Sequence, residues 1–335
     1  MKQFLKGLPK VELHAHLNGS LGVDSLRDLA ERLYGSAPEK LLELCFIRCE
    51  KDLDACFETF KFVHELTATA EGLRYATELA VRDFAQDNVQ YVELRTTPKA
   101  NAHYSRRDYL EIVIEAIIEA RKKYPDILVK LLPSINRAEP VDVAEETVSL
   151  AVELAQSYPH LILGIDLSGN PAKGRFSDFA PIISKAREMG LKLVIHCAEI
   201  KNPSEVQEML EFGMSRCGHG SFLTQKEIEL LKQRNIPIEC CLTSNVKSGT
   251  VSSLEEHHLK RIMEANAPKV ICTDDSGVFD TTLTQEFLLA TETFGLTRRQ
   301  CVDLTLEAVH HSFATDQERK KMAERVENYA ASLQK

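Results

Sequence analysis

Short apolar runs and longer amphipathic stretches alternate along most of the chain. In the stretches between the runs, apolar residues recur at spacings of three and four, which predicts helices. The runs have the length of buried strands and are apolar almost throughout, as in parallel sheets covered on both faces. The eight runs are Val11–Leu17, Val89–Thr96, Ile127–Ile135, Leu161–Leu167, Leu191–Cys197, Cys217–His219, Ile236–Leu242 and Lys269–Thr273. Eight strands alternating with helices predict an α/β fold, a (β/α)₈ TIM barrel.

Two parts of the chain fall outside this alternation. The segment Asp24–Leu79 follows the first run, is mostly helical in pattern and is too long for one crossover. We expect it to add helices beside the mouth of the barrel. The tail Leu283–Lys335 is also helical in pattern, with a break at Ser312–Gln317. Because no low-complexity linker divides the chain, we predict a single domain over residues 1–335.

Polar residues gather where the apolar runs end. The carboxyl ends of the strands form the face of a TIM barrel that carries the active site. Each of the eight runs contributes to it, through His14 and His16, Glu93 and Arg95, Asn136 and Arg137, Asp166 and Ser168, His196 and Glu199, His219, Thr243–Asn245, and Asp274 with Asp275. Polar residues that merely end buried strands would explain some of these, but not several histidines together with an Asp-Asp pair.

A metal site is the first chemistry that this pattern suggests. His14 and His16 are two apart in a predicted strand, so both side chains point to the same face. Such a pair alone is weak evidence. With His196 and Asp274 it makes a set of neutral nitrogen and carboxylate donors that suits zinc and leaves a position for water. Zinc lowers the pKa of bound water to about 7, which makes hydroxide available at neutral pH.

Two further residues can assist such a hydroxide. Glu199 lies three residues after His196 and can serve as a general acid if burial raises its pKa. His219 is flanked by Gly218 and Gly220, so its ring can lie close to the water and either orient it or take its proton. Taken singly, Glu199 could instead cap the following turn, and His219 could be an ordinary turn histidine.

Composition and charge narrow the class of protein. The 335 residues are 44% hydrophobic and 27% charged, and 41 Lys plus Arg against 50 Asp plus Glu give a net charge of −9. That balance disfavours a nucleic acid or an anionic membrane as partner, and no apolar run reaches the ~18 residues of a membrane span. The nine cysteines are odd in number and include no CxxC pair, as expected for reduced thiols in a cytoplasmic protein. We expect a monomer that binds a small molecule.

Six ordered motifs resemble the signatures of the adenosine/AMP deaminase family. The resemblance runs from about Leu8 to about Phe313. The motifs are HAHLNGS at 14–20, GIDLSG at 164–169, HCAE at 196–199, RCGHG at 216–220, TSNV at 243–246 and TDD at 273–275.

The resemblance implies a zinc-dependent purine deaminase. Zinc would be held by His14, His16, His196 and Asp274, and its hydroxide would attack C6 of the purine. Glu199 would protonate ring N1, His219 would assist the water, Asp275 would hold N7, and the backbone N–H of Gly169 would meet N3.

Asn18 bears on which purine is used. Adenosine deaminases proper usually have Asp at this position. Asn removes a negative charge that would repel a 5′-phosphate, and its amide can donate to phosphate oxygens. The motifs around it most closely resemble the adenosine deaminase-like branch, which hydrolyses N6-methyl-AMP to IMP and methylamine.

In that branch the nucleotide is also met by residues that match His16, Asn18, His64, Thr96, Thr97, Pro98, Lys99 and Asn136. Lys99 stands where Arg is common, which keeps the charge but loses the bidentate fork, and Asn136 stands where Asp is common. Lys247 is a second cationic candidate. The alternatives are an adenosine or adenine deaminase and, from another class, a catalytically silent purine- or metal-binding protein, which would not need Glu199 and His219.

Overall fold

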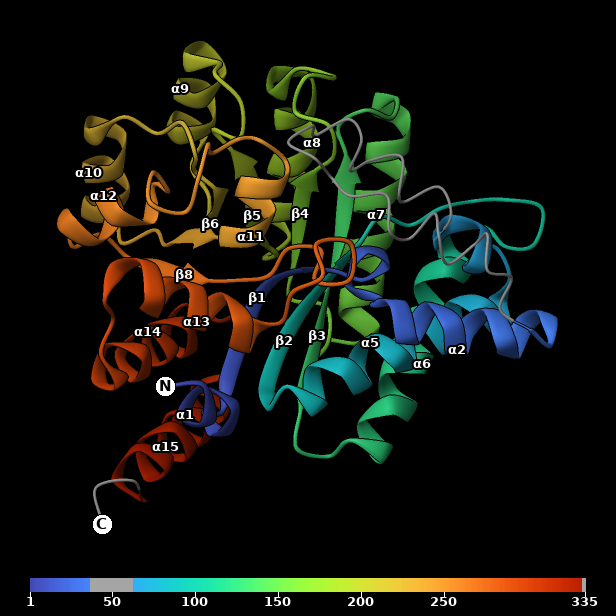
Figure 1. The fold of residues 1–335 in the computed structure, drawn as a ribbon. Helices are drawn as coiled ribbons and strands as arrows, with labels where there is room; N and C mark the ends of the chain where they lie inside the picture. Colours follow the sequence, from blue (N-terminus) through green and yellow to red (C-terminus); the bar gives the residue numbers. More distant parts are fainter. Residues whose placement is uncertain (37–62, 333–335) are drawn as a thin grey trace.

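Eight parallel strands form a barrel in the computed structural model, which describes residues 1–36 and 63–332. Neighbours along the chain are neighbours in the sheet, in the order β1 to β8 (Figure 1). The strands are β1 Lys10–His16, β2 Val89–Thr96, β3 Leu128–Asn136, β4 Gly164–Ser168, β5 Lys192–Cys197, β6 Arg216–His219, β7 Ile238–Cys240 and β8 Lys269–Ile271. The predicted (β/α)₈ architecture is confirmed, including the short sixth strand.

The first and last strands close the barrel. A parallel bridge pairs Ala15 with Asp274, and the backbone N–H of Asp274 donates to the carbonyl of His14 at 2.8 Å. Below this bridge, the carboxylate of Glu12 accepts both the backbone N–H and the hydroxyl of Thr273. Closure therefore brings Asp274 beside the histidines of β1.

Helices surround the strands, and many of them begin at a residue that caps the first turn. Ser105, Thr224 and Thr297 each form a capping box with the residue three positions later. The helices are α1 Lys2–Gly7, α2 Val23–Tyr34, α5 Ala70–Gln86, α6 Arg106–Lys123, α7 Val141–Ser157, α8 Phe176–Glu188, α9 Pro203–Phe212, α10 Gln225–Gln233, α11 Leu242–Lys247, α12 Leu259–Glu264, α13 Leu283–Phe294, α14 Arg298–His311 and α15 Asp316–Ser332, with a 3₁₀ turn at Asn18–Ser20.

The two additions to the barrel are confirmed as helical where the structure describes them. After β1 the chain forms α2 and α5, and residues 37–62 of the predicted helical segment lie outside the described residues. In the tail, α14 and α15 are separated at the predicted break. A second break at Gly295, whose φ is +70°, separates α13 from α14 and was not predicted. The short helix α11 replaces the end of the predicted seventh strand.

The core fills the space between the strands and the helices around them. Six cysteines of the described residues are free and buried, as expected for reduced thiols, while Cys45, Cys49 and Cys56 lie outside the described part. Among residues 1–36 and 63–332, no helix has the length and apolar character needed to cross a membrane.

Candidate active site

A cavity of about 300 Å³ opens at the carboxyl ends of the strands. Thirteen of the fifteen predicted site residues line it, and only His14 and Pro98 do not. The lining consists of His16, Leu17, Asn18, His64, Arg95, Thr96, Thr97, Lys99, Asn136, Ser168, Gly169, His196, Glu199, His219, Ser244, Asp274, Asp275 and Phe279. The structure thus brings together residues from all over the chain, as the positions of the strand ends predict.

Three imidazoles and one carboxylate meet at the floor of this cavity. Oδ1 of Asp274 lies 3.3 Å from Nε2 of His14 and 3.4 Å from Nε2 of His16, and Nε2 of His16 lies 3.2 Å from Nε2 of His196. His219 also lies within this cluster, with Nε2 3.9 Å from Oδ2 of Asp274. The cluster offers nitrogen and oxygen donors to a metal ion.

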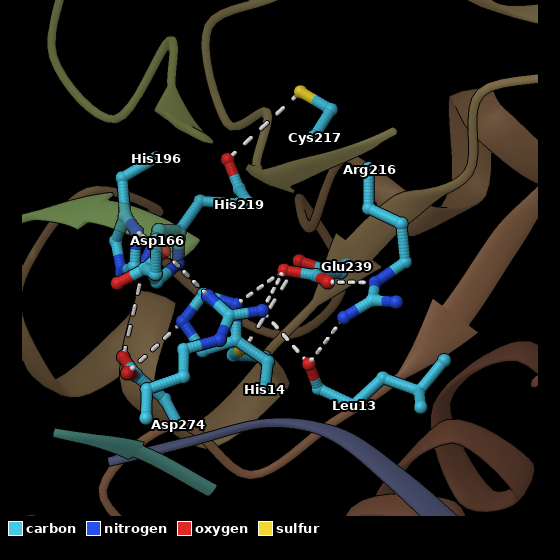
Figure 2. Close-up of polar contacts among 12 residues, drawn as sticks. Leu13, His14, Asp166, His196, Arg216, Cys217, His219, Glu239 and Asp274 are labelled. Carbon is cyan, nitrogen blue, oxygen red and sulfur yellow. Dashed lines mark hydrogen bonds and ion pairs between the residues drawn. The ribbon is translucent and has the colours of Figure 1, made fainter. Parts of the chain in front are cut away.

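The outer atoms of these residues are held by neighbours. Nδ1 of His14 lies 2.8 Å from the carboxylate of Glu239, and Nδ1 of His196 lies 3.1 Å from that of Asp166 (Figure 2). These bonds direct the Nε2 atoms toward the shared centre, as is usual for metal-binding histidines. Oγ of Ser244 donates to Oδ2 of Asp274 at 2.7 Å and leaves Oδ1 facing the histidines.

The donor set fits a divalent cation. Nε2 of His14 is buried and has no hydrogen-bond partner among residues 1–36 and 63–332. Burial lowers the pKa of His16 to about 3, so its imidazole is neutral and can act as a ligand. A buried lone pair without a partner is costly, and a metal ion would satisfy it.

Beneath the cluster, buried ion pairs anchor Glu239. Its carboxylate lies 2.6 Å from the guanidinium of Arg95 and 2.6 Å from that of Arg216, which also pairs with Glu93. Burial alone would raise the pKa of Glu239, but the two guanidinium groups hold it well below its usual value. The carboxylate is therefore charged where it meets Nδ1 of His14.

Glu199 has the protonation that a general acid needs. Burial raises the pKa of its carboxyl to about 7, and Oε2 has no hydrogen-bond partner in the described part of the chain. Its Oε1 lies 3.8 Å from Nε2 of His219, so both side chains face the same space. Burial holds the pKa of His219 well below its usual value, so this ring is neutral.

The backbone is left-handed at three positions where strands end. Ala198, His219 and Asp274 have φ values of +54°, +61° and +67°. Residues with side chains rarely adopt this conformation, and it is often found at functional sites. Here two of the three carry polar groups that face the cavity.

Further polar and cationic residues line the cavity away from the histidine cluster. Nζ of Lys99 lies 3.1 Å from Nδ1 of His64, and burial lowers the pKa of both groups. A Cβ added to Gly169, whose φ is +95°, would lie 2.1 Å from Oδ1 of Asn136, so no side chain fits there. Lys247, the second cationic candidate, does not line this cavity, and its ammonium donates to the carbonyl of Phe279.

Comparison with known proteins decides the family. The model of the adenosine deaminase family matches residues 9–329. The chain belongs to the adenosine deaminase family. It is 78% identical to the adenosine deaminase-like protein of Drosophila melanogaster over the full length of both chains. It is 39% identical to human N6-methyl-AMP deaminase over 95% of this chain and 92% of the human one.

A solved structure agrees with these relatives. The chain superposes on arabidopsis ADAL complexed with IMP with a TM-score of 0.89, at 34% identity, covering 99% of each chain. The resemblance read from the six motifs is thereby confirmed. As a member of the adenosine deaminase family, the chain is a hydrolytic deaminase.

Sequence reasoning missed residues that support this adenosine deaminase-like site. Glu239 was read as part of an apolar strand, although a carboxylate between Ile238 and Cys240 signals a buried ion pair. His257 and His258 were passed over because they lie in a loop far from any strand end. Asn245 was noted at a strand end but given no role.

Proposed function

We propose that the chain hydrolyses N6-methyl-AMP to IMP and methylamine. The observation that carries this proposal is that one cavity is lined both by Glu199 and His219 and by Asn18 and Lys99. The second pair adds one positive charge and no negative charge, which favours a 5′-phosphate over a 5′-hydroxyl. The human relative's name and the nucleotide bound to the arabidopsis structure support the same substrate class.

We assign the metal to His14, His16, His196 and Asp274, and its identity to zinc. The nitrogen and oxygen donors and their outer-shell partners suit that ion. Zinc bound there supplies Lewis acidity, which makes hydroxide available at neutral pH.

The chain's own residues handle the purine ring. The protonated carboxyl of Glu199 donates to N1, which withdraws electrons from C6 and makes it more electrophilic. Asp275 meets N7, and the backbone N–H of Gly169 meets N3, where a side chain would collide with Asn136. These contacts orient C6 toward the floor of the cavity.

The nucleotide's ribose and phosphate extend toward His64, Thr97 and Lys99. These residues line the cavity and offer hydrogen-bond donors to phosphate oxygens. Thr96 holds its hydroxyl 2.6 Å from that of Tyr109, which fixes this part of the wall. Asn18 also lines the cavity and donates through its amide, while Pro98 directly precedes Lys99.

A substrate comparison tests the proposal. Zinc-loaded enzyme is given N6-methyl-AMP, AMP, adenosine and adenine at equal concentration, and the change in purine absorbance is followed. We expect the highest kcat/KM with N6-methyl-AMP, and Asn18→Asp should reduce it at least about tenfold through repulsion of the phosphate. Faster turnover of adenosine than of either monophosphate would favour a plain adenosine deaminase.

Removal of the metal tests the assignment of the cofactor. A chelator should abolish turnover, and added Zn²⁺ should restore it at one ion per chain. A chain that binds N6-methyl-AMP but turns over none of the four purines with zinc present would be the catalytically silent protein instead.

A further inference from the structure

A second group of buried residues lies behind His219. Asn245 belongs to the short helix α11, while His257 and His258 directly precede α12. All three are at least 98% buried. None of them lines the cavity, and the proposed reaction gives them no direct part.

These residues form a chain of hydrogen bonds that ends on the ring of His219. The backbone N–H of Leu259 donates to Nδ1 of His257 at 3.0 Å. Nε2 of His257 lies 3.1 Å from Oδ1 of Asn245. Nδ2 of Asn245 lies 3.2 Å from Nδ1 of His219.

The direction of every bond follows from the first one. A backbone N–H can only donate, so Nδ1 of His257 accepts and the ring proton of neutral His257 sits on Nε2. That Nε2–H donates to Oδ1 of Asn245, whose amide N–H then donates to Nδ1 of His219. Because a neutral imidazole carries one N–H, the proton of His219 sits on Nε2.

The reversed amide of Asn245 does not satisfy the chain. Its N–H would face Nε2 of His257, which would then have to accept a hydrogen bond at both ring nitrogens. A neutral imidazole accepts at only one of them. The alternation of donors and acceptors therefore determines the orientation of the Asn245 amide as well as the tautomers of the two rings.

His258 holds the same residue from its backbone side. Nε2 of His258 donates to the carbonyl of His219 at 2.8 Å, and its ring stacks on that of His257 with the centroids 4.1 Å apart. His219 itself has a φ of +61°. The left-handed turn and the ring of His219 are thus supported by two adjacent histidines.

We infer that Asn245 and His257 are positioning residues that hold His219 in the Nε2–H tautomer, so that His219 donates a hydrogen bond to the attacking water and does not take its proton. The role of the tautomer rests on the proposed function. Once Glu199 has given its proton to N1, its carboxylate takes the proton that the water loses, and Glu199 lines the same cavity as His219. The sequence left two roles open for His219, orienting the water or taking its proton, and the Nε2–H tautomer assigns it the first.

A nitrogen spectrum tests the tautomer without any turnover. Zinc-loaded enzyme with ¹⁵N-labelled histidine is compared with the same enzyme carrying His219→Gln, which assigns the His219 signals. We expect a protonated Nε2 and an unprotonated Nδ1 on His219. A proton on Nδ1 in the wild-type enzyme would overturn the inference.

Asn245→Asp replaces the hydrogen-bond donor at Nδ1 of His219 with an acceptor. A carboxylate only accepts, so His219 should move its proton to Nδ1 and present a bare Nε2 to the water. We expect kcat to fall about 10²–10⁴-fold, as for a misplaced tautomer elsewhere, with KM for N6-methyl-AMP changed less than about threefold and zinc content unchanged. If His219 were a general base, this variant would keep or gain activity, which would refute our inference.

A matched pair at His257 controls for structural damage. Gln places a donor where Nε2 of His257 lies and an acceptor for Leu259, whereas Glu of the same size offers acceptors only. His257→Gln should retain at least about tenfold more kcat than His257→Glu and should show the wild-type ring signals of His219. Equal losses in both, with unchanged signals, would show a merely structural role.

These measurements separate the inference from the proposed function. A wild-type spectrum with Nε2–H but no turnover of N6-methyl-AMP would refute only the proposed substrate. Rapid turnover together with a proton on Nδ1 would refute only the positioning role. Thermal unfolding of each variant confirms that it is folded before its kinetics are read.

Discussion

Two polar layers lie one above the other inside the barrel, and they satisfy their charges in different ways. In the lower layer, the carboxylates of Glu93 and Glu239 pair with the guanidinium groups of Arg95 and Arg216. In the upper layer, at the cavity floor, Nε2 of His14 and Oε2 of Glu199 have no hydrogen-bond partner within the residues that the structure describes. The charges of the lower layer are paired within the protein, whereas the upper layer has capacity left for a ligand.

The pKa shifts of two buried glutamates express the same difference. Two guanidinium groups outweigh the effect of burial on Glu239 and hold its pKa well below the usual value. Burial dominates at Glu199 and raises its pKa to about 7. The different neighbours of the two carboxyl groups thus give a permanently charged anchor in one layer and a proton carrier in the other. If the two layers differ in this way, changes in the lower layer should act mainly on stability and changes in the upper layer mainly on turnover.

Glu199→Gln should have the largest effect, and it should fall on turnover. Gln cannot deliver a proton to N1, so kcat should drop about 10²–10⁴-fold. The variant should keep its zinc and its unfolding midpoint, because Gln is neutral like the protonated carboxyl. Kinetics, metal analysis and thermal unfolding check this together. Turnover at the wild-type level would remove Glu199 from the mechanism.

Glu239→Gln should instead act on stability. It leaves two buried guanidinium groups with one carboxylate fewer, and breaking such a pair costs about 3–5 kcal/mol in free energy of unfolding. Zinc affinity should also fall about 10–100-fold, because His14 loses its charged partner. Denaturant unfolding and metal titration measure the two effects.

The matched control for Glu239→Gln is Glu153→Gln, which breaks an ion pair with Arg107 at the surface. We expect no measurable change in unfolding or metal binding, since exposed pairs contribute little. A loss as large as that of Glu239→Gln would mean that the lower layer has no special importance.

Ser244→Ala tests the outer support of the upper layer itself. Without the hydroxyl, Oδ2 of Asp274 loses its donor, and zinc affinity should fall about tenfold with a small change in stability. Ser134→Ala is the control, because Ser134 in β3 is buried like Ser244 but its hydroxyl has no partner among the described residues. The control should bind zinc as the wild type does, and metal titration of the two variants gives the answer.

The smallest effect is the pH dependence of kcat/KM. Glu199 acts in its protonated form, which is present below its pKa and lost above it. As pH rises through about 7, kcat/KM should begin to fall, approaching about tenfold per pH unit. A bound cation would shift this limb to lower pH, because positive charge favours the carboxylate. In Glu199→Gln the limb should disappear, and a limb that persists would belong to another group.

The sequence predicted the upper layer far better than the lower one. His14, His196 and Asp274 stand at the ends of apolar runs, where strand periodicity and the barrel rule place them on one face. Glu239 and Arg216 pair between the neighbouring strands β7 and β6, and such a pairing depends on the register between strands, which one sequence does not reveal. The helix α11 was missed because Leu242 and Val246 continue the apolar pattern of β7.

The loop histidines were harder still. His257 reaches the site through Asn245 and through its stacking on His258, so no spacing along the chain links it to His219. Their relation depends on how the loop before α12 folds back over α11. Residues that act through a neighbour are harder to predict from the sequence than residues that face the ligand.

The bridge between β1 and β8 has a consequence for the order in which the enzyme matures. The hydrogen bond from Thr273 to Glu12 spans 261 residues of chain, and closing a loop of that length costs about 5 kcal/mol of chain entropy beyond a constant term. On the ribosome, His14 and His16 emerge long before Asp274, so a nascent chain offers only part of the metal site. Tight metal binding therefore awaits the joining of the last strand to the first, and a metal ion that binds the finished site opposes its reopening.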